Sequence, residues 1–419
     1  MHHKFTLKNG ATVVLIPLTN TKSVTSMVMY PVGSRHETDD MAGVSHYVEH
    51  LMFKGTQKRD STLKLTKEID RLGAHYNAFT GKEYTGYYIK TDGAYTDISL
   101  DILSDMLFHS LFDTVEMERE KHVIVEEIRM YNDNPIMNID NIFEDVMFAG
   151  CPLGRDIAGT EAHVLGYDRN DVIAYRDTHY QPENMYIVLA GNVDLIETKK
   201  MVEKYFEGQT NVSNSRQYLP AAFGSNKKED RIDVRHKKTD QAQMMMGFPG
   251  VERNNKLSAP IAVLNSILGG SMSSRLFIKI RERLGLAYSV RSGAEYFKDT
   301  GFVYVQAALE AKNINKAIEE IKFEIESIKK DGVTEQELAD AKTHLQGSLT
   351  LSMESSSSIA NWYADEALFS DDIQTPEDWN NEIKHVTLKE VQDIANQLYN
   401  MSELRVAIIG DVKKQDINF

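Results

Sequence analysis

The spacing of apolar residues alternates along the chain between the repeat of a strand and that of a helix. Residues 12–17 form an apolar run after an Asn-Gly turn signal and residues 24–30 alternate loosely, so both predict strands. Residues 84–89, rich in Tyr and Thr, predict a third strand. Apolar residues at helical spacing predict helices over residues 44–52, 61–72, 95–111 and 114–132. This mixture favours an α+β fold over a doubly wound parallel sheet.

A segment of the first half recurs in the second half, which indicates an internal duplication. Residues 171–193 read as a helix followed by an apolar strand that ends in Gly-Asn-Val, and residues 390–412 repeat that order and end in Gly-Asp-Val. Residues 208–230 are polar, as in a linker. We therefore predict two homologous α/β sandwich domains, each a mainly antiparallel sheet packed by helices. Their predicted bounds are 1–207 and 231–419.

His46-Tyr47-Val48-Glu49-His50, an H-x-x-E-H segment, is the most informative part of the chain. Positions i, i+3 and i+4 share one face of a helix, so both histidines and Glu49 point the same way. Two imidazoles so spaced bind one zinc ion, and the carboxylate reaches a water molecule at the metal. An accidental grouping is the alternative for the segment alone. A catalytic zinc site needs a third protein ligand.

The predicted helix over residues 114–132 supplies a candidate for that ligand. At about 100° per residue, Glu120 and Glu127 fall within roughly 20° of each other, in the middle of the apolar face. Buried carboxylates need a cation or hydrogen-bond partners. We therefore expect Glu127 to be the third ligand and Glu120 to support the site or handle protons. Glu126 points to the opposite face, and a Glu pair bonded to backbone or Arg is the alternative.

The matching positions of the second half carry no such residues. Asn265, Leu268 and Gly269 stand where the motif stands in the first half, and no H-x-x-E-H occurs after residue 50. We therefore expect one domain with a metal site and one without.

Composition limits the other classes of function. The 419 residues carry a formal net charge of −15, which disfavours nucleic acid as a partner and favours basic peptides. The single cysteine, Cys151, excludes an internal disulfide framework and any multi-cysteine metal site. The sequence shows no signal peptide and no apolar run of membrane-spanning length, so we expect a cytoplasmic protein without a membrane partner.

These features together resemble the pitrilysin/insulinase family of zinc metallopeptidases, and within it the mitochondrial-processing-peptidase-like branch with its bacterial members. The signature of that family is H-x-x-E-H followed after about 75 residues by Glu, and residues 51–126 separate the motif from Glu127 here. The run Leu51–Thr56 and the glutamates seven positions apart also match. The resemblance implies one zinc ion per chain, with His46, His50 and Glu127 as its ligands.

The resemblance also assigns roles on the substrate side. Glu49 is expected to act as the general base that takes a proton from the attacking water. Residues 73–80 resemble an edge strand to which a peptide substrate adds its own backbone, with Asn77 and Ala78 against the substrate. Arg281 and Tyr288 resemble a pair that binds the substrate backbone, and the Tyr of that pair steadies the oxyanion.

The expected function is that of a zinc-dependent endopeptidase which cleaves unfolded or extended peptides, including basic presequence-like ones, inside a closed chamber. Members of the resembled branch pair two chains of this length. Because the metal set and the Arg/Tyr pair occur in one chain here, we expect a homodimer, with a heterodimer as the alternative. Two other functions stay open. One is a non-catalytic assembly subunit like the respiratory-complex core proteins, and the other is a zinc hydrolase of a small amide.

Overall fold

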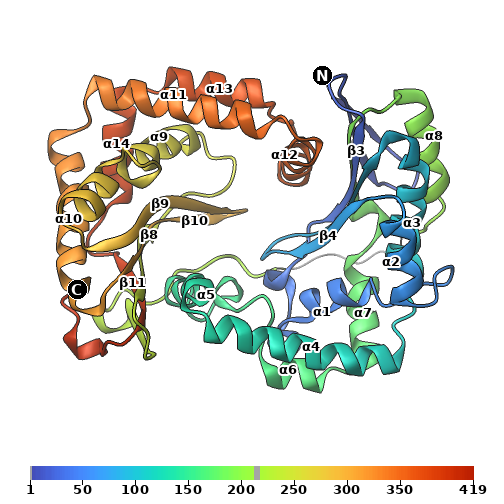
Figure 1. The fold of residues 1–419 in the computed structure, drawn as a ribbon, viewed down its shortest axis with the longest axis horizontal. Coiled ribbons are helices and arrows are strands. Elements are labelled where there is room, and N and C mark those ends of the chain that lie inside the picture. Colours follow the sequence, from blue (N-terminus) through green and yellow to red (C-terminus); the bar gives the residue numbers. More distant parts are fainter. Residues whose placement is uncertain (1, 212–217) are drawn as a thin grey trace. The chain divides into compact units, whose positions relative to one another are not determined.

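The computed structural model describes residues 2–211 and 218–419, which form two compact units, each considered by itself (Figure 1). The first unit comprises Met1–Arg129, Asp156–Leu219 and Ser352–Ile373. The second comprises Met130–Arg155, Pro220–Leu351 and Gln374–Phe419. Residues 212–217 of the predicted linker lie outside the described residues.

The first unit contains a six-stranded sheet of order β1-β2-β6-β3-β5-β4. Its strands are β1 (His3–Thr6), β2 (Thr12–Pro17), β3 (Ser23–Tyr30), β4 (His75–Thr80), β5 (Thr85–Asp92) and β6 (Tyr186–Gly191). Every neighbouring pair is antiparallel except β2 and β6, which run parallel. The strand β4 is therefore an edge, and its outer side has no strand partner in the described part of the chain.

The second unit repeats this topology. Its sheet has the order β7-β11-β8-β10-β9 and contains β7 (Ile232–His236), β8 (Ala242–Pro249), β9 (Ala287–Phe297), β10 (Thr300–Leu309) and β11 (Arg405–Gly410). The last strand of the first unit, β6, lies between β2 and β3, parallel to β2 and antiparallel to β3. The last strand of the second unit, β11, lies in the same way between β7 and β8, parallel to β7 and antiparallel to β8. The predicted α+β class with two antiparallel-dominated sheets is confirmed.

Helices cover both faces of each sheet. In the first unit these are α1 (Val44–Leu51), α2 (Thr62–Asp70), α3 (Thr96–His109), α4 (Thr114–Asp133), α6 (Glu161–Gly166), α7 (Arg169–His179), α8 (Leu195–Phe206) and α12 (Ser356–Phe369). In the second they are α5 (Pro135–Met147), α9 (Ser258–Gly269), α10 (Ile314–Asp331), α11 (Glu335–Ser352), α13 (Pro376–His385) and α14 (Leu388–Leu398). Burial from both sides explains why β2 and β6 read as nearly continuous apolar runs.

One helix in each unit comes from the opposite half of the sequence. The helix α12 packs on β2, β3 and β6, where Ala360 and Ala364 belong to a buried cluster that includes Met27 and Val188. The helix α5 packs on β7, β8 and β11 of the second unit. The compact units therefore differ from the contiguous domains expected at 1–207 and 231–419. An amphipathic pattern shows that a helix has an apolar face, but does not show which sheet that face covers.

The predicted elements agree with the observed ones to within a few residues. The strand expected over 84–89 is β5, which extends to Asp92, and the helix expected over 61–72 is α2, which ends at Asp70. Residues 220–230 of the predicted linker belong to the second unit, where Gly224 donates its N–H to the carbonyl of Met147.

Candidate metal centre

The helix α1, which carries the H-x-x-E-H segment, is held at its first turn. Gly43 precedes it with a φ of 97°, and a Cβ there would lie 2.5 Å from the carbonyl oxygen of Ala158, so a glycine is required. The buried carboxylate of Glu37 accepts hydrogen bonds from the backbone N–H groups of Gly43 and Ser45, at 2.7 and 2.8 Å. These bonds satisfy otherwise unpaired donors and fix the start of the helix.

Three side chains of α1 and α4 converge on one point. The Nε2 atoms of His46 and His50 are 3.2 Å apart, and Glu127 Oε2 lies 3.8 Å from the first and 3.5 Å from the second. Ligand atoms at about 2.0–2.1 Å from a tetrahedral zinc ion are about 3.3 Å apart. The donor set and its spacing therefore fit a zinc ion, with two imidazole nitrogens and one carboxylate oxygen.

The proton positions also fit a metal. The Nδ1 atom of His50 lies 2.8 Å from Glu120 Oε1, so it carries the proton and the lone pair of Nε2 faces the other ligand atoms. Burial first, and His50 second, lower the pKa of His46 to about 3, which favours its neutral form. A neutral His46 has a lone pair on Nε2 that is available to a metal ion.

Glu120 lies between the Nδ1 atom of His50 and the ammonium of Lys54. Its side chain is 6% exposed, and its second oxygen accepts from the ammonium of Lys54 at 2.6 Å. Burial by itself would raise the pKa of Glu120, but hydrogen bonds from His50 and Lys54 lower it below its ordinary value. The same Glu120 carboxylate raises the pKa of His50 against the opposing effect of burial.

Glu49 lies on the same side of α1 as the two histidines and is held by a strand residue. The helix contacts β4, and Thr80 at the end of that strand donates its hydroxyl to Glu49 Oε2 at 2.6 Å. Burial raises the pKa of Glu49 above its ordinary value, although the bond from Thr80 opposes the shift. A carboxyl group with a raised pKa suits a group that accepts and returns protons.

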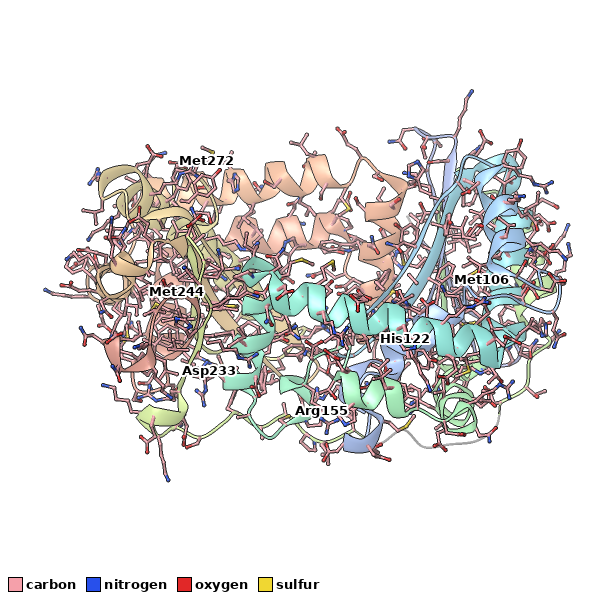
Figure 2. The ribbon with its side chains drawn as sticks, turned by 60° about the horizontal axis from the view of Figure 1, so that its bottom comes forward. Met106, His122, Arg155, Asp233, Met244 and Met272 are labelled. Carbon is pink, nitrogen blue, oxygen red and sulfur yellow. The ribbon has the colours of Figure 1, made fainter. Side chains whose placement is uncertain are left out.

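The residues on the exposed side of α4 are those that the helical spacing of about 100° per residue predicts. Glu126 has a side chain that is 72% exposed and pairs with Arg129 at 2.7 Å, so it points away from the histidines. His122 is also on the exposed side (Figure 2). Val123 on the same helix is half exposed, because only part of α4 is covered.

The predicted substrate-side residues fall in both units. Asn77 is exposed on the edge strand β4, whereas the neighbouring Ala78 is buried because successive side chains of a strand alternate between its faces. Arg281 lies in a π-helix, Phe277–Arg283, and its guanidinium is 5.5 Å from the ring of Tyr288, which is 70% exposed. The structure thus brings Arg281 and Tyr288 together within the second unit.

Sequence reasoning assigned no role to Thr80, Lys54 or Glu37. Lys54 stood within the matched run after the motif, but its contact with Glu120 depends on how α1 and α4 pack. The bond from Thr80 to Glu49 depends on the contact between β4 and α1. Tertiary contacts of this kind leave no periodic signal in a single sequence.

The second unit carries no equivalent of this site in its described residues. The positions expected to match the motif lie on α9, where Asn265, Leu268 and Gly269 are buried. Across residues 2–211 and 218–419, His46, His50 and Glu127 are the one group of three or more such side chains with ligand atoms close enough to share a metal ion.

Two sequence-family models match the chain. The one described as "Insulinase (Peptidase family M16)" matches residues 12–161, and the one described as "Peptidase M16 inactive domain" matches residues 167–345. An uncharacterized zinc protease of Bacillus subtilis, YmxG, is 36% identical over 95% of this chain and 96% of its own length. This chain belongs to the insulinase family, M16.

Two other proteins match over similar lengths. An uncharacterized zinc protease of Streptomyces coelicolor is 33% identical over 97% of this chain and 89% of its own. The crystal structure of a protease from Helicobacter pylori superposes with a TM-score of 0.91 at 25% identity, over 98% of this chain and 99% of that one. The Bacillus and Streptomyces relatives are named zinc proteases, and the Helicobacter protein is named a protease.

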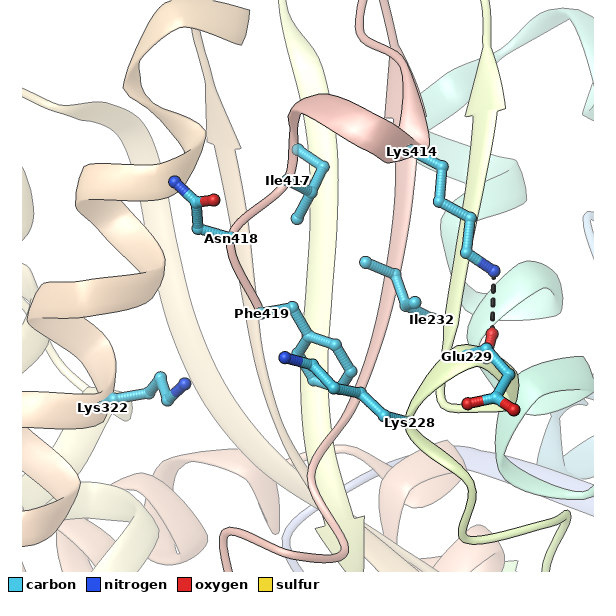
Figure 3. Close-up of a pocket in the computed structure, with 8 residues that line it drawn as sticks. All are labelled: Lys228, Glu229, Ile232, Lys322, Lys414, Ile417, Asn418 and Phe419. Atoms are coloured by element: carbon cyan, nitrogen blue, oxygen red, sulfur yellow. Dashed lines mark hydrogen bonds between the residues drawn. The ribbon is translucent and has the colours of Figure 1, made fainter.

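Two surface cavities are separate from the residues of the metal centre. One of about 610 Å³ is in the second unit and is lined by Lys228, Glu229, Ile232, Lys322, Lys414, Ile417, Asn418 and Phe419 (Figure 3). Lys414 is tied to the backbone there, because its ammonium donates to the carbonyl of Glu229. The other, of about 500 Å³, is in the first unit beside Tyr180. Among the helices of the described residues, none combines the length and apolarity that crossing a membrane demands.

Proposed function

We propose that this M16 protein is a zinc-dependent endopeptidase with one zinc ion per chain, bound by His46, His50 and Glu127. The observation that carries the proposal is the convergence of the three ligand atoms within 4.8 Å of one another, next to Glu49. The M16 relatives named as zinc proteases, which match along nearly the whole chain, support it.

The side chains around the ligands divide the chemistry between them. A zinc ion, when bound, supplies Lewis acidity toward a scissile carbonyl and toward water. Glu49 accepts a proton from the attacking water molecule as the oxygen of that water bonds to the carbonyl carbon. The same carboxyl group then returns that proton to the amine nitrogen as the C–N bond breaks. Thr80 orients Glu49 during both transfers, and Glu120 orients His50.

Extended peptides are the substrates that the edge strand favours. The backbone of β4 has no strand partner on its outer side in the described residues, and Asn77 is exposed on it. A peptide that adds there as a further strand is bound mainly through hydrogen bonds of its backbone, so peptides of many sequences can bind. We propose basic, presequence-like peptides because the net charge is −15, and we assign Arg281 and Tyr288 to the substrate backbone.

The proposal extends to assembly and location. A homodimer, with a heterodimer as the alternative, would supply each metal site with the Arg/Tyr pair of a second chain, inside a closed chamber. A cytoplasmic location is consistent with the single cysteine, Cys151, which is unpaired and buried. A non-catalytic assembly role is disfavoured by the complete set of metal-binding side chains.

Cleavage of a quenched fluorescent basic peptide by the wild type and by Glu49→Gln tests the proposal, with zinc quantified in both. We expect about one zinc per chain in each protein and a loss of turnover of roughly 10²-fold or more in the variant. Zinc without turnover on a broad peptide library would move the proposal to a missing partner or a non-peptide amide. Neither zinc nor turnover would favour the assembly role.

A further inference from the structure

A lysine that follows the metal-binding helix contacts the site through one carboxylate. Lys54 is three residues beyond the end of α1, and its ammonium lies 2.6 Å from Glu120 Oε2. The other oxygen of Glu120 is 2.8 Å from His50 Nδ1. Lys54, Glu120 and His50 therefore form a continuous row of polar contacts. The row ends at Nδ1 of His50, and the other ring nitrogen, Nε2, is the proposed zinc ligand.

The three side chains of this row are largely buried. The side chain of Lys54 is 22% exposed, that of Glu120 6% and that of His50 21%. An ion pair at this depth is screened less by water and salt than one at the surface, so it holds its geometry more firmly. A carboxylate pinned at one oxygen by an ammonium has little freedom to rotate its other oxygen away from an imidazole.

The two histidines are supported unequally. The Nδ1 atom of His46 is buried and has no hydrogen-bond partner among the described residues. A metal-binding histidine ordinarily donates its second N–H to a carboxylate or carbonyl group, which fixes the tautomer and the direction of the ring. Of these two histidines only His50 has such a hydrogen bond among the described residues, and it makes that bond with Glu120. The orientation of the two imidazole rings therefore depends on the contacts of Glu120.

We propose that Lys54 is a positioning residue that sets the zinc affinity by holding Glu120 against His50. The inference rests on the proposed function for the identity of the metal, but not on peptide cleavage. Without Lys54, Glu120 can turn toward solvent, and His50 then loses the contact that selects its tautomer. We expect weaker zinc binding with little change in the fold, because Lys54 lies outside the buried apolar core.

The test measures the zinc dissociation constant of the full-length protein by competition with a chromophoric chelator. The variants are Lys54→Met, which keeps the length of the side chain, and Lys54→Gln, which keeps a neutral donor. Lys58→Met is the matched control, since Lys58 also pairs with a carboxylate of the first unit, Asp101, at 2.5 Å. We expect a rise of about tenfold in the dissociation constant for both Lys54 variants and none for Lys58→Met. Each metal-free variant should still unfold cooperatively, which shows that the fold is kept.

A double-mutant cycle with Glu120→Gln tests the route of the effect. If Lys54 acts through Glu120, then Lys54→Met should weaken zinc binding no further once Glu120 is replaced. Additive losses would overturn the inference, as would an unchanged dissociation constant in Lys54→Met or an equal rise in Lys58→Met. Tight zinc binding by the wild type with no effect of Lys54 would leave the proposed function standing. Absence of zinc binding by the wild type would overturn both.

Discussion

Five side chains of the metal centre have separate tasks that follow from their positions. His46, His50 and Glu127 present ligand atoms to one point, whereas Glu49 faces the edge strand and Glu120 faces the rear of His50. The sequence predicted that these three side chains lie together, because helical spacing and the cost of burying a carboxylate are local arguments. The supports of these side chains come from other elements and were not predicted.

Replacement of Glu127 should remove zinc, whereas replacement of its neighbour should not. Glu127→Gln takes away the one carboxylate of the ligand set, so we expect the zinc dissociation constant to rise by roughly 10²-fold or more. Glu126→Gln changes an exposed side chain that pairs with Arg129 and should bind zinc as the wild type does. Metal analysis after dialysis measures both. Zinc retained in Glu127→Gln, or lost in Glu126→Gln, would show that the wrong glutamate has been assigned.

Thr80 should affect turnover without affecting the metal. Its hydroxyl donates to Glu49, the proposed general base, so Thr80→Val leaves Glu49 free to turn and should lower kcat by about tenfold, with a smaller effect on KM. Thr80→Ser keeps the hydroxyl and should restore most of the rate. Steady-state kinetics with zinc content measured in parallel tests this. Equal loss in the Val and Ser variants would indicate that the methyl group, rather than the hydroxyl, is the important part.

At the scale of secondary-structure elements, caps and helix ends position the functional residues. Glu37 and Gly43 fix the start of α1 in the first unit. In the second unit, Glu337 completes a capping arrangement at the start of α11, where it accepts from the backbone of Thr334 and pairs with Arg275 at 2.6 Å. The Thr334–Glu337 cap joins residues three apart and is therefore a local pattern, whereas the contact with Arg275 depends on tertiary packing.

The Arg275–Glu337 pair should make stability depend on acid pH. Its hydrogen bond with Arg275 lowers the pKa of Glu337 from 4.5 to about 2, so the folded state favours the charged form. The contribution of Glu337 is therefore fully present above about pH 4.5 and is lost as pH falls toward 2. We expect Glu337→Gln to lower the free energy of unfolding at pH 7 and to have less effect at pH 3.

Urea unfolding at the two pH values measures this difference. The control is Glu335→Gln, which changes an exposed carboxylate in the first turn of the same helix. Glu335→Gln should show little difference between the two pH values. A loss of stability in Glu337→Gln that is the same at pH 3 and pH 7 would contradict the assignment of the pKa shift to the folded state.

For the whole molecule, the repeated strand order records the duplication more clearly than the sequence does. Two similar segments, 219 positions apart, predicted a repeat, and both sheets have the same topology, with an additional strand, β1, in the first. The exchange of α5 and α12 between the sequence halves was not predicted, because both candidate sheets present an apolar face to such a helix. Each unit is therefore completed by a segment from the other half.

This exchange predicts that a residue late in the chain stabilises the unit with the metal centre. Ala364 on α12 is fully buried against the first sheet, so Ala364→Asp places an unpaired charge in that cluster and should destabilise the unit by about 3 kcal/mol or more. Asn361→Asp adds the same charge on the exposed side of α12 and should change stability by less than about 0.5 kcal/mol. Thermal unfolding with zinc release as a second signal distinguishes them. Equal stability of both variants would contradict the packing of α12.

The central claim is that His46, His50 and Glu127 hold a zinc ion, and its location is the most direct test. Crystals of the protein grown with zinc and measured on both sides of the zinc absorption edge give a map of the metal alone. We predict one anomalous peak per chain, about 2.0–2.2 Å from His46 Nε2, His50 Nε2 and a carboxylate oxygen of Glu127. A fully occupied peak elsewhere, or none at these side chains in zinc-replete crystals, would contradict the claim.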